Sequence, residues 1–354
     1  MRSVNFYFPW RCVSSSSLTH MSSGDIIRTK LTENAVRVDA FINELLKPRR
    51  PEILYEASRH LVMAGGKRLR PYLTVKSCEI VGGKPQDAIP YSAGLEILHN
   101  FTLVHDDVMD NDKVRRGTST VHTKYGIPIA ICAGDLLFAK VYEAFTIHAP
   151  HGINAKKIRS CVEAATRATI ELCEGQTLDL SFPDTAFVSE EDYFLMIGGK
   201  TSALFRACAE VGAIVGGGSK RQVNALGKFA YDAGISFQIV DDILGLTANE
   251  NTLGKPVGSD LREGKKTLII IYALKHAKGR QKKILETVLG NKNGKKEDIE
   301  EAIQVLQYLG AIDYASKKAD RYLIQAKKQL DRFPDSAAKR DLDELIDYFT
   351  KRIY

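Results

Sequence analysis

The stretch SAGLEILHNFTLVHDDVMD, residues 92–110, indicates how the chain folds. Its first part, 92–104, is apolar around much of a helical circumference, which is typical of a helix packed inside a large bundle. Segments 133–147 and 226–244 have the same character. Several helices of this kind must bury one another, so the sequence predicts an all-α fold with these helices in its interior.

The rest of the chain supports a single all-α domain. From about residue 31 onward, segments long enough for helices of several turns alternate with short breaks, and the chain has only 11 prolines. No alternating run bounded by Asn-Gly or Asp-Gly predicts a hairpin, and no strand–helix alternation predicts a parallel sheet. We therefore expect one domain over residues 25–354, ending in an amphipathic helix at 336–353.

Residues 1–24 differ from the remainder. They contain two arginines and a serine run but no acidic residue. This composition is typical of an organellar transit peptide, although Met21 could equally be the working start. In either case we expect a dispensable tail. A cytoplasmic location is the main expectation, with organellar targeting as the alternative.

Composition narrows the function classes. The 354 residues are 44% hydrophobic and 26% charged, which excludes wholesale disorder. No apolar run approaches the roughly 18 residues of a membrane-spanning helix, so integral membrane contact is not expected. The net charge of +7 is compatible with an anionic small molecule or with nucleic acid. The six cysteines lack zinc-ligand spacing and are interpreted as core residues of a protein in a reducing compartment.

Two pairs of acidic residues follow apolar helices. Asp106 and Asp110 are four residues apart, so their carboxylates share a helix face. Asp241 and Asp242 end a second apolar helix much later in the chain. Either pair alone could be a solvated helix end. Together they can face each other across a bundle, and Mg²⁺ prefers such an arrangement of a few carboxylates plus substrate phosphates.

Basic residues cluster beside breaks in the chain, and two of the clusters adjoin the acids. They are Lys67, Arg68 and Arg70; Arg115 and Arg116; and Lys255 and Lys265. Arginine and lysine side chains suit phosphate oxygens, so this pattern favours a phosphorylated substrate. A nucleic-acid binder would need an exposed basic stripe instead, and we do not expect a nucleic-acid partner.

Seven motifs, in the same order as in the family, make the chain resemble the trans-isoprenyl diphosphate synthases over roughly residues 35–350. They are GGKRLRP (65–71), EILHNFTLVHDDVMD (96–110), RRG (115–117), CEGQTLDL (173–180), GKTSALF (199–205), FQIVDDIL (237–244) and GKPVGSDLREGKKT (254–267). The likeness is greatest to the archaeal geranylgeranyl diphosphate synthase branch. It implies the isoprenoid synthase fold, with about ten core helices around a deep central cavity, usually in a homodimer.

The resemblance also implies a role for individual residues. Asp106, Asp110 and Asp241 would bind about three Mg²⁺ ions per active site; Arg115, Lys200, Lys255 and Lys265 would bind the allylic diphosphate; Lys67, Arg70, His99 and Arg116 would bind isopentenyl diphosphate without metal; and Thr201 and Gln238 would join Lys200 as catalytic residues facing the carbocation. Phe101 and Thr102 would form part of the floor that limits product length. One departure is Gly245, where the family usually has a third aspartate, and we expect it to be tolerated.

The expected function is a transferase of isoprenoid biosynthesis that adds isopentenyl diphosphate to dimethylallyl, geranyl and farnesyl diphosphates and releases mainly the C20 product. A farnesyl, mixed C15/C20 or C25 synthase is the alternative within the family. A terpene cyclase has no need of a second anion pocket. A non-catalytic partner subunit should have lost carboxylates or phosphate-binding bases, whereas only Gly245 departs from the pattern.

Overall fold

A computed structural model describes residues 23–247 and 257–350 of the chain and confirms the all-α prediction. The α-helices are α1 (Ser23–Leu45), α2 (Glu52–Met63), α3 (Leu69–Ile80), α4 (Pro85–Met109), α5 (Val121–Tyr125), α6 (Ile127–Thr146), α7 (Ala155–Ser181), α8 (Glu190–Ile197), α9 (Ala203–Val215), α10 (Lys220–Thr247), α12 (Ser259–Glu263), α13 (Leu268–His276), α14 (Gly279–Val288), α15 (Lys296–Tyr308), α16 (Ala311–Leu330) and α17 (Ala337–Thr350). Lys255 and nearly all of the tail predicted at 1–24 lie outside the described residues.

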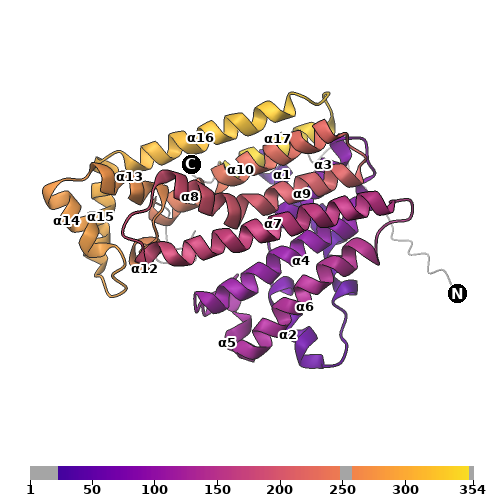
Figure 1. Ribbon diagram of the computed structural model, residues 1–354, viewed down its shortest axis with the longest axis horizontal. Coiled ribbons are helices and arrows are strands. Elements are labelled where there is room, and N and C mark those ends of the chain that lie inside the picture. The colour runs from indigo at the N-terminus through magenta and orange to yellow at the C-terminus, as the bar shows by residue number, and fades with distance from the viewer. Residues whose placement is uncertain (1–22, 248–256, 351–354) are drawn as a thin grey trace.

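Helices α4 and α10 form the centre of the bundle. Helix α4 packs against α3, α6 and α9, and α10 packs against α9 and α16. Figure 1 shows the long helices side by side, with α2 and α5 at the lower edge and α12–α15 gathered at the left end. The apolar runs that predicted buried helices, 92–104 and 226–244, therefore lie inside α4 and α10.

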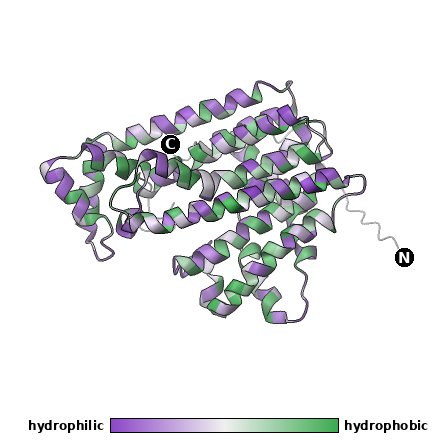
Figure 2. Cartoon of the chain, in the orientation of Figure 1, coloured by the Kyte–Doolittle hydropathy of each residue, from purple (hydrophilic) through white to green (hydrophobic). Residues whose placement is uncertain are grey.

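The buried residues form two apolar clusters. The larger cluster joins α1–α7, α9, α17, the first part of α10 and the last part of α16. The second joins the last part of α10 to α8 and α12–α16. In Figure 2, the outer helices α7 and α16 carry hydrophilic residues interspersed with hydrophobic ones, as expected for helices with one face in the core. Helix α10 belongs to both clusters, so it links the two ends of the bundle.

The structure contains a short hairpin that the sequence did not predict. Strands β1 (Val114–Arg115) and β2 (Thr118–Ser119) pair antiparallel across the turn formed by Arg116 and Gly117. Both turn residues have positive φ, 53° and 73°, as a two-residue hairpin turn requires. Strands of two residues have no readable alternation, and Arg-Gly is not a usual turn signal. The pattern-based prediction of no hairpin was wrong for this reason.

Candidate active site

Asp106, on the last turn of α4, is the meeting point of four elements. Its Oδ1 accepts a hydrogen bond of 2.7 Å from Gln176 Nε2 of α7. Lys200 Nζ lies 3.6 Å from the same oxygen, and Arg115 Nη2 lies 3.6 Å from Oδ2. The carboxylate is therefore held between two cations at the end of an otherwise apolar helix.

Asp110 ends α4 one turn later. Its backbone N–H donates to Asp106 O over 2.8 Å, so the two carboxyl groups sit on one side of the helix end. Although Asp110 is exposed, the surrounding protein desolvates its carboxyl and raises its pKa, and the charge of Asp106 raises it further. Lys200 and Lys265 act in the opposite direction. Two repelling carboxylates close to two lysines form a site ready for a cation with anionic ligands.

Lys200 is presented by a π-helical turn, η3 (Gly198–Ser202). This turn crosses α7 in backbone contact, because a Cβ on Gly175 would overlap the Lys200 backbone nitrogen and a Cβ on Gly199 would overlap the carbonyl of Glu171. Burial acts to lower the pKa of Lys200, but Asp106 and its ion-pair partner Asp179 outweigh burial and raise it. The lysine is therefore a fixed cation at the first acid cluster.

The second acid cluster lies at the end of α10, where the two aspartates have different surroundings. Asp241 is exposed, whereas Asp242 is buried. Asp242 accepts hydrogen bonds from the Tyr193 hydroxyl (2.7 Å) and Gln238 Nε2 (3.0 Å). Burial raises the pKa of Asp242 to about 8, and the nearby charge of Asp260 contributes. Asp241 is therefore the carboxylate of the pair that faces outward from the helix end.

Thr201 and Gln238 extend this hydrogen-bonded group. The Thr201 hydroxyl donates to Gln238 Oε1 over 2.8 Å, and Gln238 in turn donates to Asp242. The π turn and the end of α10 are thus joined by a continuous chain of polar side chains. The two residues are held beside Lys200 and close to both acid clusters.

Lys265 connects the two acid clusters electrostatically. Its Nζ lies 3.8 Å from Asp260 Oδ1 and 3.2 Å from Glu263 Oε2. Its charge also interacts with those of Asp179 and Asp110. Lys265 therefore acts on Asp110 at the end of α4 and on Asp260, whose charge acts in turn on Asp242 at the end of α10.

Arg70, Arg116 and the imidazole of His99 form a second cluster, the cationic pocket, whose members interact electrostatically. The Arg70 guanidinium stacks over Phe205 at 4.4 Å, and its Nε is buried without a hydrogen-bond partner among the described residues. Burial, followed by the charges of Arg70, Arg116 and further arginines, holds the pKa of half-buried His99 well below its usual value. The cations here outnumber the acids near them, so the pocket favours an anion. Lys67 is exposed, and its Nζ lies 5.9 Å from the centre of the Tyr348 ring of α17.

Neighbouring arginines in this region have different roles. Arg115 forms ion pairs with Asp107 and Asp112 and approaches Asp106, whereas Arg116 Nη1 donates to Asn100 Oδ1 at 3.1 Å and to the carbonyl of Gly65. Arg115 ends β1, and Arg116 is the first residue of the turn. Arg115 therefore belongs to the acid cluster and Arg116 to the cationic pocket.

The model of the polyprenyl synthetase family matches residues 51–306, which include both acid clusters and the cationic pocket. The chain belongs to the polyprenyl synthetase family. A geranylgeranyl diphosphate synthase of Sulfolobus acidocaldarius is 44% identical over 289 residues, which cover 82% of this chain and 86% of that protein. A geranylfarnesyl diphosphate synthase of Aeropyrum pernix is 39% identical over 307 residues, with coverage of 86% and 95%.

The polyprenyl synthetase fold is also evident from solved structures. The crystal structure of geranylgeranyl pyrophosphate synthetase from Pyrococcus horikoshii is similar to this chain with a TM-score of 0.88 and 42% identity. The match covers 94% of this chain and 100% of that one. The isoprenoid synthase fold inferred from the motifs is therefore confirmed.

Several residues of the site were not predicted from the sequence. Arg68 was grouped with Lys67 and Arg70, yet it is buried against Asp39 (2.8 Å) and Glu96 (2.9 Å) and stabilises the loop instead of facing the pocket. Gln176, Asp179, Asp107, Asn100 and Tyr193 also contact site residues. Gln176 and Asp179 are three apart in CEGQTLDL, a signal that could have placed both on one face of α7.

Phe101 and Thr102 point to different surroundings on α4. Phe101 packs against Phe138 of α6 at 5.1 Å and against His105 at 4.9 Å. The Thr102 hydroxyl donates to the carbonyl of His99. The aromatic side chain therefore fills the α4–α6 interface about one helical turn below the first acid cluster.

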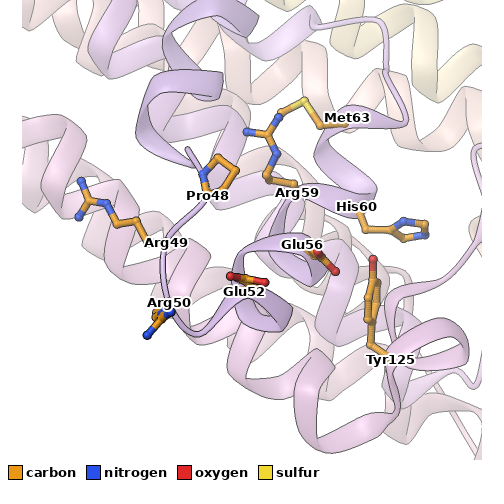
Figure 3. A pocket seen from close by; sticks show the side chains of 9 residues that line it. All are labelled: Pro48, Arg49, Arg50, Glu52, Glu56, Arg59, His60, Met63 and Tyr125. Atoms are coloured by element: carbon orange, nitrogen blue, oxygen red, sulfur yellow. The ribbon is translucent and has the colours of Figure 1, made fainter.

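An open hollow of about 700 Å³ lies away from this site, at the start of α2. Figure 3 shows its mixed lining, which includes Arg49, Arg50, Glu52 and Glu56. Arg59 in this lining binds the carbonyl of Leu46. The hollow does not contain the acid clusters or the cationic pocket, so its size is no guide to the chemistry.

Among the described helices, none is both long and apolar enough to cross a membrane.

Proposed function

We propose that this polyprenyl synthetase condenses isopentenyl diphosphate with dimethylallyl, geranyl and farnesyl diphosphates and releases mainly geranylgeranyl diphosphate. The observation that carries the proposal is the presence of two distinct charged clusters along α4, about two helical turns apart at His99 and Asp106. One cluster contains both acids and lysines. The other, around Arg70, His99 and Arg116, contains more cations than carboxylates. Two diphosphate substrates require two such sites.

Asp106, Asp110 and Asp241 are the residues that would hold Mg²⁺ at the acid site. Carboxylate oxygens are hard ligands that suit this ion, and Mg²⁺ takes several of its ligands from substrate phosphates and water. Among the described residues, no group of three or more His, Cys, Asp or Glu side chains could hold a metal ion by itself. The expected number of about three ions is part of the proposal. Bound Mg²⁺ would stabilise negative charge on the leaving diphosphate.

The chain's own cations would assist the same step. The C1–O bond of the allylic substrate breaks and its electron pair leaves with the diphosphate, beside Arg115, Lys200 and Lys265. Lys255 would join them, although it lies outside the described residues. Preorganised cations stabilise charge where it develops. The double bond of isopentenyl diphosphate, held by Arg70 and Arg116, then supplies the electron pair of the new carbon–carbon bond.

A proton is finally lost from the condensed product to the departing diphosphate, which restores a double bond. The allylic carbon is positively charged from C–O cleavage until the new carbon–carbon bond forms, and the charge then lies on the tertiary carbon of the former isopentenyl unit until the proton is lost. The Thr201 hydroxyl and Gln238 amide oxygens, fixed by their hydrogen bond, are the polar groups assigned to face that charge. Apolar helix walls exclude water that would otherwise capture the cation.

The C20 product is favoured over C25 by the names of the relatives and by Phe101. The Sulfolobus relative and the Pyrococcus structure are both named for geranylgeranyl diphosphate synthesis. The Aeropyrum relative, named for geranylfarnesyl diphosphate, keeps the C25 alternative open at lower identity. Phe101 and Thr102 would limit the chain by filling the space alongside α4.

A homodimer is proposed from the outer surfaces of α6 and α7. Large apolar side chains are exposed there, among them Ile127 (51%), Ile131 (44%) and Ile170 (55%). Such side chains at four-residue spacing on α6 form a stripe that a second copy would cover. The expected cytoplasmic location remains a prediction.

The activity is tested with purified protein, isopentenyl diphosphate and each allylic diphosphate in turn, with and without MgCl₂. We expect Mg²⁺-dependent formation of geranylgeranyl diphosphate from all three starters, identified by mass spectrometry. Conversion of a single allylic diphosphate to a hydrocarbon without use of isopentenyl diphosphate would indicate a cyclase instead. No turnover with any starter, despite a folded protein, would indicate a non-catalytic subunit.

A further inference from the structure

The second acid cluster lacks a third carboxylate on α10, because Gly245 stands four residues after Asp241. The space left by the missing side chain is bordered by another acid. A Cβ on Gly245 would lie 3.1 Å from Oδ2 of Asp260, a residue of the separate helix α12. An acidic side chain from elsewhere in the chain therefore reaches the position from which a third aspartate would project.

We infer that Asp260 supplies the third carboxylate of the second acid cluster in place of the one absent at Gly245, and that it acts with Asp241 in holding the Mg²⁺-bound allylic diphosphate. This inference rests on the proposed function. Asp260 belongs to the GSDLREG segment, and the family resemblance implied no role for it.

The backbone fixes Asp260 in this place. The N–H of Gly258 donates to the carbonyl of Gly245 over 3.0 Å, which ties the segment before Asp260 to α10. Gly258 has a φ of 73° and packs so closely on Ile299 that a Cβ would overlap it. On the other side, Lys265 N–H donates to the Asp260 carbonyl over 2.9 Å, and Leu261 is buried. The position beside Gly245 is therefore a property of the fold.

The carboxylate is also accessible in a way that Asp242 is not. Asp242 is buried and its oxygens are engaged by Tyr193 and Gln238, while the Asp260 side chain is 24% exposed. Asp260 lies near enough to raise the pKa of Asp242. Asp241 and Asp260 are thus both accessible at this end of the site.

The competing explanation is that Asp260 serves only to hold Lys265, whose Nζ is 3.8 Å away. Glu263 is a matched control for this possibility, because it is also acidic, lies in α12 and approaches the same nitrogen more closely, at 3.2 Å. Its side chain is 44% exposed, and no contact relates it to Gly245.

The test uses full-length protein and inorganic diphosphate as the probe, with binding measured by calorimetry at fixed MgCl₂ and again in EDTA. Asp260→Asn is expected to weaken the Mg²⁺-dependent binding by about 10–100-fold, the usual effect of removing a residue that supports a metal site. Glu263→Gln should stay within about threefold of wild type. Thermal melting without ligand establishes that each variant is folded.

A double variant tests whether a carboxylate supplied by α10 can replace that of Asp260. Gly245→Asp combined with Asp260→Asn returns an acid to the cluster from α10 and should recover most of the lost binding. Wild-type binding in the Asp260→Asn variant, equal losses in Asp260→Asn and Glu263→Gln, or a folded double variant without recovery would each overturn the inference. If wild type itself shows no Mg²⁺-dependent binding of diphosphate, the proposed function fails first.

Discussion

Lys200 Nζ lies 3.6 Å from Asp106 Oδ1, although one residue belongs to a π turn and the other to the end of α4. Gly175 and Gly199 make this approach possible by letting α7 and the π turn touch through their backbones. The site thus depends on helix packing as much as on its charged groups.

Substitution of Gly175 tests that dependence. Alanine usually stabilises a helix relative to glycine, but here its Cβ would overlap the Lys200 backbone. Gly175→Ala is expected to lower the free energy of unfolding by about 1–3 kcal/mol and to reduce turnover by displacing Lys200. Glu174→Ala, at an exposed neighbouring position of α7, should change neither the free energy of unfolding, measured with denaturant, nor turnover, measured in steady-state assays. A fully active, equally stable Gly175→Ala protein would contradict the packing argument.

Removal of an individual carboxylate should lower turnover by orders of magnitude. Asp106→Ala, Asp110→Ala and Asp241→Ala each remove a proposed Mg²⁺ ligand, and metal stabilisation of the leaving group is worth several kcal/mol. The measurement is kcat at saturating substrates over a range of MgCl₂ concentrations. Asp331→Asn, at an exposed position after α16, serves as the control. Near-normal kcat in all three variants would refute the metal assignment.

The adjacent arginines should separate the two substrates kinetically. Arg116→Ala removes a cation from the pocket of Arg70 and His99, so the KM for isopentenyl diphosphate should rise by about 10–100-fold with a smaller effect on the allylic KM. Arg115→Ala, one residue earlier, should show the reverse pattern because Arg115 faces Asp106. Equal changes in both KM values for both variants would rule out two separate pockets.

Product length should respond to substitutions on α4. Phe101→Ala opens the contact with Phe138 and is expected to extend products to C25 or beyond, whereas Thr102→Phe fills space and should shorten them toward C15. A helical turn rises about 5.4 Å, comparable to one isoprene unit, so one position can shift the product by one addition. Mass spectrometry of the products decides, and an unchanged C20 product in both variants would place the floor elsewhere.

His99 should make stability depend on pH in the acidic range. Its pKa is lowered in the folded protein, first by burial and then by Arg70 and Arg116, so the unfolded chain binds this proton more readily. The contribution of neutral His99 to the free energy of unfolding is present above the unfolded pKa of about 6.5 and is lost as the pH falls below that value. Between about pH 7 and pH 5, Tm should therefore fall less in His99→Gln than in wild type. Exposed His151→Gln provides the control, and identical pH profiles for wild type and His99→Gln would show that the histidine titrates normally.

The sequence allowed prediction of what depends on composition and order along the chain. The apolar runs of α4 and α10 and the acids that follow them were recognisable because burial and helix periodicity act locally. The different environments of Arg68 and Arg70 were not, because Asp39 and Glu96, which neutralise Arg68, come from other helices. The same holds for Asp260, whose place beside Gly245 depends on a return of the chain that no local pattern records.

In the hairpin of β1 and β2, Arg115 is the last residue of β1 and Arg116 is the first residue of the turn, and each arginine is directed to a different charged site. Because the two arginines are adjacent in one short hairpin, we expect a shift that draws one guanidinium toward its ligand to carry the other with it. Occupancy of one substrate site and readiness of the other are then mechanically linked. Each substrate should bind more tightly when its partner is present, by the same factor in both directions.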